Sequence, residues 1–126
     1  MNTLFVYGTL RREESNCCFL KKSEFIGIDY VKGFIMLDFG DYPMIFKSGN
    51  EDVITVEIYK IDDYTLHQID IFEEYSGIYD DNNLYFREAV KNISGVTGFI
   101  YTGNAKKKFT GGQLVESGDW TKRSQI

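Results

Sequence analysis

The stretch that decides the fold is Leu4-Phe5-Val6-Tyr7-Gly8-Thr9-Leu10-Arg11-Arg12, close to the start of the chain. Its first part, Leu4 to Tyr7, is continuously apolar, which predicts a short strand buried on both faces. Gly8-Thr9 interrupts the apolar run directly after this strand. A glycine turn lets backbone N–H groups face outward together and form a concavity that suits an anion such as a carboxylate. A simple tight turn has the same sequence pattern, so the motif alone leaves both interpretations open.

Segments with the pattern of strands outnumber those with the pattern of helices. The strand-like segments lie at 25–30, 33–38, 44–46, 53–61, 84–93 and 96–102, with Ser94-Gly95 as the two-residue turn of a hairpin between the last two. Apolar residues on both faces of 53–61 predict a central strand. Asp62 or Asp63 is expected to cap a helix that runs to about Tyr75. Residues 12–22 are expected to form a short helix or an irregular arm.

This order of elements predicts an α+β fold with one main helix. Because many short strands have few helices to cover them, we expect a mostly antiparallel sheet that curls or closes into a small barrel. A chain of 126 residues is long enough for one core, so residues 1–126 are expected to form a single domain.

Charge and hydropathy exclude several classes of partner. The net charge of −5 disfavours a nucleic-acid partner, because a phosphate backbone requires an excess of positive charge. No apolar run approaches the roughly 20 residues that span a bilayer, and the first residues do not have the pattern of a signal peptide. We therefore expect a cytoplasmic protein with no membrane partner. The sequence does not indicate an oligomeric state.

The cysteines and the histidine do not form a recognisable metal or redox motif. Cys17 and Cys18 are adjacent, so they cannot link distant segments, and we expect reduced thiols. They lack the CxxC spacing, and His67 lies far away in sequence, which disfavours a redox or nucleophilic role. These three residues also lack the spacing of an ordinary zinc site. The pairs Asp62-Asp63 and Asp80-Asp81 leave a magnesium site open, although their positions favour turns and helix caps.

Glu73 stands out because the helical phase turns it inward. At about 100° per residue, Glu73 falls between Leu66 and Ile69 on the apolar side of the helix, whereas Asp70 falls on the shoulder that faces water. A buried carboxyl group is costly unless it is paired, and its desolvation raises its pKa into the range useful for proton transfer. Two structural alternatives stay open: an ion pair with Arg87, or a helix that frays before Glu73.

Five segments spread over nearly the whole chain resemble the γ-glutamylcyclotransferase-like (AIG2-like) superfamily. Residues 5–12 resemble its opening signature, Ile69-Asp70-Ile71-Phe72-Glu73 its Leu-Asp-x-Phe-Glu element, and Tyr85-Phe86-Arg87-Glu88-Ala89-Val90 its Tyr-x-Arg-x-x-Val strand. Gly40-Asp41-Tyr42-Pro43 and Glu116-Ser117-Gly118-Asp119-Trp120 are similar to segments of its bacterial members. The resemblance is greatest to the small bacterial and γ-glutamylaminecyclotransferase-type members.

The resemblance implies a small mixed β-barrel with short flanking helices and no cofactor or metal. It implies that Glu73 is the catalytic residue and that the loop of Tyr7, Gly8, Thr9 and Leu10 holds the γ-glutamyl group. The substrate-binding residues expected in addition are Arg87, from the Tyr-x-Arg-x-x-Val strand, and Tyr101. Three departures from the family pattern leave Glu73 untouched and concern the leaving group: Glu13 in place of a glycine, Asn16-Cys17 in place of Asn-His, and Thr55 in place of a glycine.

The implied reaction is that of a γ-glutamylcyclotransferase-type lyase or acyltransferase acting on a small-molecule γ-glutamyl-amine or γ-glutamyl-amino acid. The α-amine of the substrate attacks its own γ-carbonyl and releases 5-oxoproline and a free amine, so the enzyme needs no nucleophile of its own. Glu73 would take the proton of the α-ammonium group and pass it to the departing amine. The backbone N–H groups of Gly8, Thr9 and Leu10 would bind the α-carboxylate.

Two other interpretations of the sequence compete with that of an enzyme. A module of the same fold could bind a small carboxylate without turning it over, but it would not need an acid at position 73. A barrel that serves mainly as an interaction domain would show a large exposed aromatic patch, and the chain has 9 Tyr, 10 Phe and 1 Trp to form one. No residue singles out glutathione or any particular amine as part of the substrate.

Overall fold

The strand at the start of the chain, β1 (Asn2–Val6), lies inside a five-stranded sheet in the computed structural model, which describes residues 1–77, 82–107 and 111–123. It pairs antiparallel with β5 (Val53–Ile61) and parallel with β7 (Thr97–Gly103). Because β1 has a neighbour on each side and is covered on both faces, its residues Leu4 to Val6 are at most 3% exposed. β5 is likewise central and buried for most of its length, as predicted.

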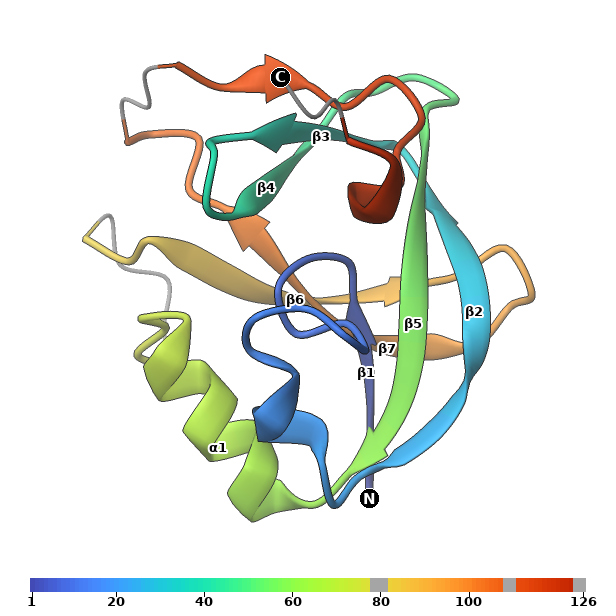
Figure 1. The fold of residues 1–126 in the computed structure, drawn as a ribbon, viewed down its shortest axis with the longest axis vertical. Coiled ribbons are helices and arrows are strands. Elements are labelled where there is room, and N and C mark those ends of the chain that lie inside the picture. The colour runs from blue at the N-terminus through green and yellow to red at the C-terminus, as the bar shows by residue number, and fades with distance from the viewer. Residues whose placement is uncertain (78–81, 108–110, 124–126) are drawn as a thin grey trace.

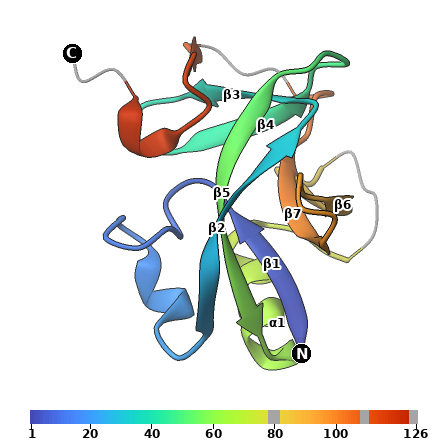
Figure 2. The ribbon, with the colours of Figure 1, turned by 90° about the vertical axis from the view of Figure 1, so that its right-hand side faces the viewer.

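Two sheets and one main helix make up the architecture of the described residues. The first sheet has the order β2-β5-β1-β7-β6, with β2 (Glu24–Lys32) and β6 (Tyr85–Lys91) at its edges. The second has the order β4-β3-β8 and comprises β3 (Phe34–Asp38), β4 (Pro43–Lys47) and β8 (Gln113–Leu114). Figures 1 and 2 show the second sheet at one end of the molecule and helix α1 (Asp63–Phe72) at the other. The predicted α+β class with mostly antiparallel strands is confirmed.

The closed barrel is not found, because the pairing among the described strands gives two open sheets. Gly33 has a φ of 94°, a conformation that glycine adopts readily, and turns the chain out of the first sheet between β2 and β3. The two sheets then approach each other through side chains. The Phe46 ring of β4 lies only 2.7 Å from the place where a Cβ on Gly103 of β7 would be. Packing, rather than a ladder of hydrogen bonds, therefore joins β4 to β7.

Helix α1 is shorter than predicted. The Asp62 side chain caps its first turn by accepting a hydrogen bond from the N–H of Thr65 at 2.7 Å. The helix ends at Phe72 instead of Tyr75, because Glu74 adopts a left-handed φ of 55°. Glu73 still donates its N–H to the carbonyl of Ile69 at 2.8 Å. Its backbone therefore continues the helical direction for one more residue.

The connections also differ from those predicted. The β6–β7 hairpin has a five-residue connection, 92–96, in place of a two-residue turn, because the Asn92 side chain accepts the N–H of Val96 and so closes a wider loop. The arm after β1 contains a 3-10 helix, η1 (Cys17–Leu20), and a second one, η2 (Trp120–Lys122), lies near the C-terminus. No helix of the described residues is both long and apolar enough to cross a membrane.

A buried ion-pair network ties the arm after β1 to the C-terminal segment. Arg11 donates from Nε to Glu57 at 2.9 Å and from Nη1 to Asp119 at 2.8 Å, and its side chain is 5% exposed. The second oxygen of Glu57 accepts the backbone N–H of Arg12 at 2.9 Å. Three segments that are distant in sequence thus meet at one guanidinium group.

We predict that Arg11→Met lowers the free energy of unfolding by about 3–5 kcal/mol, because it leaves the Glu57 carboxylate buried without its cation. Lys32→Met is the matched control: Lys32 pairs with Glu51 at 2.9 Å, but the two side chains are 54% and 86% exposed. This control should lose about 0–1 kcal/mol. Urea denaturation with unchanged slope measures both losses. Equal small losses would show that the Arg11 network does not hold the fold together.

Candidate active site

The loop Tyr7–Leu10 leaves the end of β1 and forms one wall of a cavity. Gly8 is required here by close packing rather than by a left-handed backbone conformation, because it is not among the residues with positive φ. A Cβ on Gly8 would lie 2.5 Å from Cγ and 2.8 Å from Cδ of Pro43, the only proline of the chain. Any side chain at position 8 would therefore push β4 away from the loop.

The backbone of this loop keeps donors available. Arg11 donates its N–H to the carbonyl of Gly8, and Asn16 donates to that of Thr9. The N–H groups of Gly8, Thr9 and Leu10 make no hydrogen bond within the described part of the chain. Consecutive free N–H groups of this kind are the donors that bind anions such as a carboxylate.

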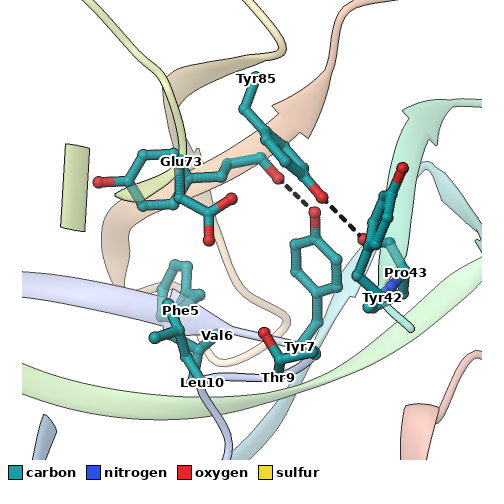
Figure 3. A pocket seen from close by; sticks show the side chains of 11 residues that line it. Phe5, Val6, Tyr7, Thr9, Leu10, Tyr42, Pro43, Glu73 and Tyr85 are labelled. Carbon is teal, nitrogen blue, oxygen red and sulfur yellow. Dashed lines mark hydrogen bonds between the residues drawn. The ribbon is translucent and has the colours of Figure 1, made fainter. Parts of the chain in front are cut away.

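Glu73 enters the cavity from the other side, at the end of α1 (Figure 3). Its side chain is half-buried and takes part in no ion pair within the described residues. Burial, with a smaller contribution from the charge of Glu74, raises the pKa of the Glu73 carboxyl group from 4.5 to about 8. Near neutral pH this group therefore exchanges its proton readily, as an acid–base catalyst requires.

Asp70 takes the cation that could have paired with Glu73. Arg87 forms its ion pair with Asp70, and its guanidinium group also lies over the ring of Phe99, 4.7 Å from the centroid. Asp70 accepts a second hydrogen bond, of 2.5 Å, from the Tyr101 hydroxyl group. The prediction that Asp70 faces water is therefore wrong, because Arg87 and Tyr101 reach over it. Of the two structural alternatives for Glu73, the ion pair with Arg87 is not formed.

Tyrosine hydroxyl groups surround Glu73. The Tyr7 hydroxyl donates to the carbonyl of Tyr101 at 2.8 Å, and the Tyr85 hydroxyl donates to the carbonyl of Pro43 at 3.0 Å (Figure 3). Burial raises the pKa of both tyrosines, and the nearby Glu73 charge raises them further. Both hydroxyl groups thus stay protonated and donate their hydrogens to carbonyl oxygens. Their oxygen lone pairs remain able to accept a hydrogen bond from a cation in the cavity.

The cavity brings together most of the residues that the sequence predicted for the site. Its volume is about 30 Å³, and a larger groove adjoins it. Six predicted residues line it: Tyr7, Gly8, Thr9, Leu10, Glu73 and Tyr101. Arg87 does not line it, because its guanidinium group is held by Asp70.

Five further lining residues were not predicted as part of the site, and two of them, Phe5 and Val6, belong to β1 just before the loop. Tyr42, Pro43 and Tyr85 belong to segments that matched the family pattern, but no property of the sequence alone placed their side chains in the cavity. The nearest signal is the single proline, whose position next to an aromatic residue indicated a fixed turn.

The cysteines and the histidine lie outside the cavity. Cys17 and Cys18 are free thiols in η1, and His67 is exposed on α1. In the described ranges, no group of three or more His, Cys, Asp or Glu residues could hold a metal ion. Asp62 is a helix cap, as expected, and Asp80 and Asp81 lie outside the described residues.

Comparison with known proteins connects this site to one family. The family model described as "Gamma-glutamyl cyclotransferase, AIG2-like" matches residues 4–122. A Vibrio cholerae protein, assigned by its name to the gamma-glutamylcyclotransferases, is 35% identical over 121 residues, which cover 95% of this chain and 96% of that protein. The gamma-L-glutamyl-butirosin B gamma-glutamyl cyclotransferase of Niallia circulans is 35% identical over 108 residues, covering 82% of this chain and 68% of that protein.

A solved structure shows the same fold. An uncharacterized protein from Pyrococcus horikoshii superposes with a TM-score of 0.74 at 26% identity, covering 95% of this chain and 90% of that one. The sequence resemblance is thereby confirmed over nearly the whole length of the chain. The chain belongs to the gamma-glutamyl cyclotransferase, AIG2-like family.

Proposed function

We propose that residues 1–126 form, as one domain, a γ-glutamyl cyclotransferase that converts a γ-glutamyl-amine or a γ-glutamyl-amino acid to 5-oxoproline and a free amine. The main support is the carboxyl group of Glu73, which lies in the same cavity as the free N–H groups of the Tyr7–Leu10 loop and has no cationic partner among the described residues. The name of the Niallia circulans relative, a γ-glutamyl cyclotransferase, supports the same reaction.

The cavity suits the amino-acid end of a γ-glutamyl group. The N–H groups of Gly8, Thr9 and Leu10 would donate to its α-carboxylate. Its α-ammonium group would donate to Glu73 and to the hydroxyl oxygens of Tyr7 and Tyr85. The backbone donors of the loop and the side-chain acceptors around Glu73 thus match the two charges of the substrate. Tyr101 forms the adjoining wall, and Arg87 positions Tyr101 through Asp70 rather than touching the substrate.

In this mechanism Glu73 transfers two protons, one after the other, from the α-nitrogen to the leaving nitrogen. A bound ammonium group favours the ionised form of the nearby carboxyl group and so lowers its pKa from the value near 8 in the free enzyme. Glu73 then takes a proton from the α-ammonium group, and the freed amine attacks the γ-carbonyl. A bond forms between the α-nitrogen and the γ-carbon, and Glu73 passes its proton to the leaving nitrogen. The ionised Glu73 then takes the second proton from the α-nitrogen, the bond to the leaving nitrogen breaks, and Glu73 passes this proton to the released amine. Holding the α-nitrogen close to the γ-carbon lowers the activation free energy by several kcal/mol more.

We predict that Glu73→Gln lowers the turnover number by about 10²–10⁴-fold, because an amide cannot accept and return the proton. The fold should persist, since glutamine has nearly the same shape as glutamate. The measurement is release of 5-oxoproline, by mass spectrometry, from a panel of γ-glutamyl amino acids, γ-glutamyl alkylamines and ε-(γ-glutamyl)lysine. Glu24→Gln, at an exposed position on β2, is the matched control and should retain full activity.

Two results would contradict these assignments. Full activity of Glu73→Gln would remove Glu73 from the mechanism. No release by the folded wild-type protein across the whole panel would instead favour a module that binds a small carboxylate without turning it over.

The raised pKa of Glu73 also predicts a dependence of stability on pH. Between about pH 5 and pH 8 the folded protein keeps a proton on Glu73 that the unfolded chain has lost, so this group makes the free energy of unfolding fall as the pH rises. Glu73→Gln has no such ionisation. Relative to the wild type, we expect the variant to gain about 2–5 kcal/mol between pH 5 and pH 9. Urea denaturation at several pH values measures this gain, and parallel curves for the two proteins would refute the raised pKa.

A further inference from the structure

A groove of about 360 Å³ adjoins the cavity and shares four lining residues with it: Thr9, Tyr42, Glu73 and Tyr85. The shared side includes the carboxyl group that would return a proton to the leaving nitrogen. A group attached to the γ-carbonyl of a substrate in the cavity would therefore extend past Glu73 into this groove. The groove is thus placed where the leaving amine must lie.

One side of the groove offers apolar surface. Phe72 and Leu84 line it, next to the ring of Tyr42. Phe72, the last residue of α1 and the neighbour of Glu73 in the chain, is 39% exposed. Its ring packs on that of Phe19 with the centroids 4.7 Å apart. This exposed apolar surface suits the methylene groups of an alkyl chain.

The charge of the groove has one sign. Asp41 is its only charged lining residue besides Glu73, and no Lys, Arg or His is among the described residues that line it. Asp41 is exposed and takes part in no ion pair within the described ranges. Its carboxylate is therefore available to a ligand.

The surface beyond the groove is acidic as well. A neighbouring hollow shares Thr9, Ser15 and Asp41 with the groove and adds Glu13, Glu14 and Arg123. Arg123 offsets only one of these acids, because it lies over the Trp120 ring and pairs with Glu14 at 3.5 Å. Glu13, which stands where the family often has a glycine, is exposed and has a left-handed φ of 67°.

We infer that the groove binds the leaving amine and selects leaving groups that carry an additional positive charge, with Asp41 as the specificity-determining residue. This inference rests on the proposed function. The class of substrate is a γ-glutamyl amide of a diamine or polyamine, whose methylene chain contacts Phe72 and Leu84 and whose second ammonium group approaches Asp41. A leaving group that ends in a carboxylate, as in γ-glutamyl peptides, meets the same acidic surface and is disfavoured.

The test uses three amides of similar length that differ in terminal charge. Their leaving groups are 1,5-diaminopentane, pentylamine and 6-aminohexanoate, and kcat/KM is measured from release of 5-oxoproline. We expect kcat/KM to fall in that order by about three- to fivefold per step, as for a charge pair in contact with solvent. The differences should shrink when the salt concentration is raised.

Variants then test the role of Asp41 itself. Asp41→Asn should lower the preference for the diamine amide over the pentylamine amide by about three- to fivefold, and Asp41→Lys should reverse the order of the three amides. Asp52→Asn, which removes the same charge at an exposed position outside the groove, should leave the order unchanged. Equal kcat/KM for all three amides, or an order that Asp41→Asn does not change, would overturn the inference.

A binding measurement separates this inference from the proposed function. If no amide releases 5-oxoproline, the proposed function fails, but calorimetric binding of the three amides to Glu73→Gln still tests the groove. Tightest binding of the diamine amide supports charge selection by Asp41. Equal affinities, or no binding of any of the three, overturn it.

Discussion

The ion pair between Asp70 and Arg87 decides the electrostatics of the cavity. Arg87 lies on β6 close enough to α1 to neutralise one of its acids, and it neutralises Asp70. Had the guanidinium group faced Glu73, that carboxyl group would be an ionised structural partner with a low pKa. Because Asp70 holds the cation, Glu73 experiences burial and the repulsion of Glu74. The same Asp70 accepts from the Tyr101 hydroxyl, and the Tyr101 carbonyl accepts from Tyr7. One ion pair thus connects the helix, the sheet and the loop that form the site.

A second constraint is steric and acts between the two sheets. The loop after β1 touches Pro43 so closely that position 8 has no room for a side chain. The Pro43 carbonyl in turn accepts the hydroxyl of Tyr85, which brings β6 to the same place. The cavity wall therefore depends on contacts between segments far apart in the chain.

Local patterns predicted the parts of the fold that depend on local chemistry. The apolar runs of β1 and β5 identified buried strands, the pair Asp62-Asp63 identified the start of α1, and the helical phase predicted that Glu73 faces inward. Such patterns could not predict whether the sheet closes into a barrel, because strand pairing depends on where Gly33 turns the chain. The sequence also could not predict whether Arg87 pairs with Asp70 or with Glu73. The two acids are three residues apart and lie near the same side of the helix. Only the position of β6 decides between them.

The arrangement of charge argues against a site that merely holds a carboxylate. The free N–H groups on the Tyr7–Leu10 loop are sufficient to bind an anion, whereas a half-buried acid that faces them disfavours anion binding. A carboxyl group withdrawn from water without a cation costs free energy, and apolar or amide side chains of similar volume would avoid that cost. A ligand with both an anion and an adjacent ammonium group removes the conflict, because each charge finds its complement in the cavity. Proton transfer from that ammonium group requires a desolvated acid at this position, whereas binding of a carboxylate alone does not.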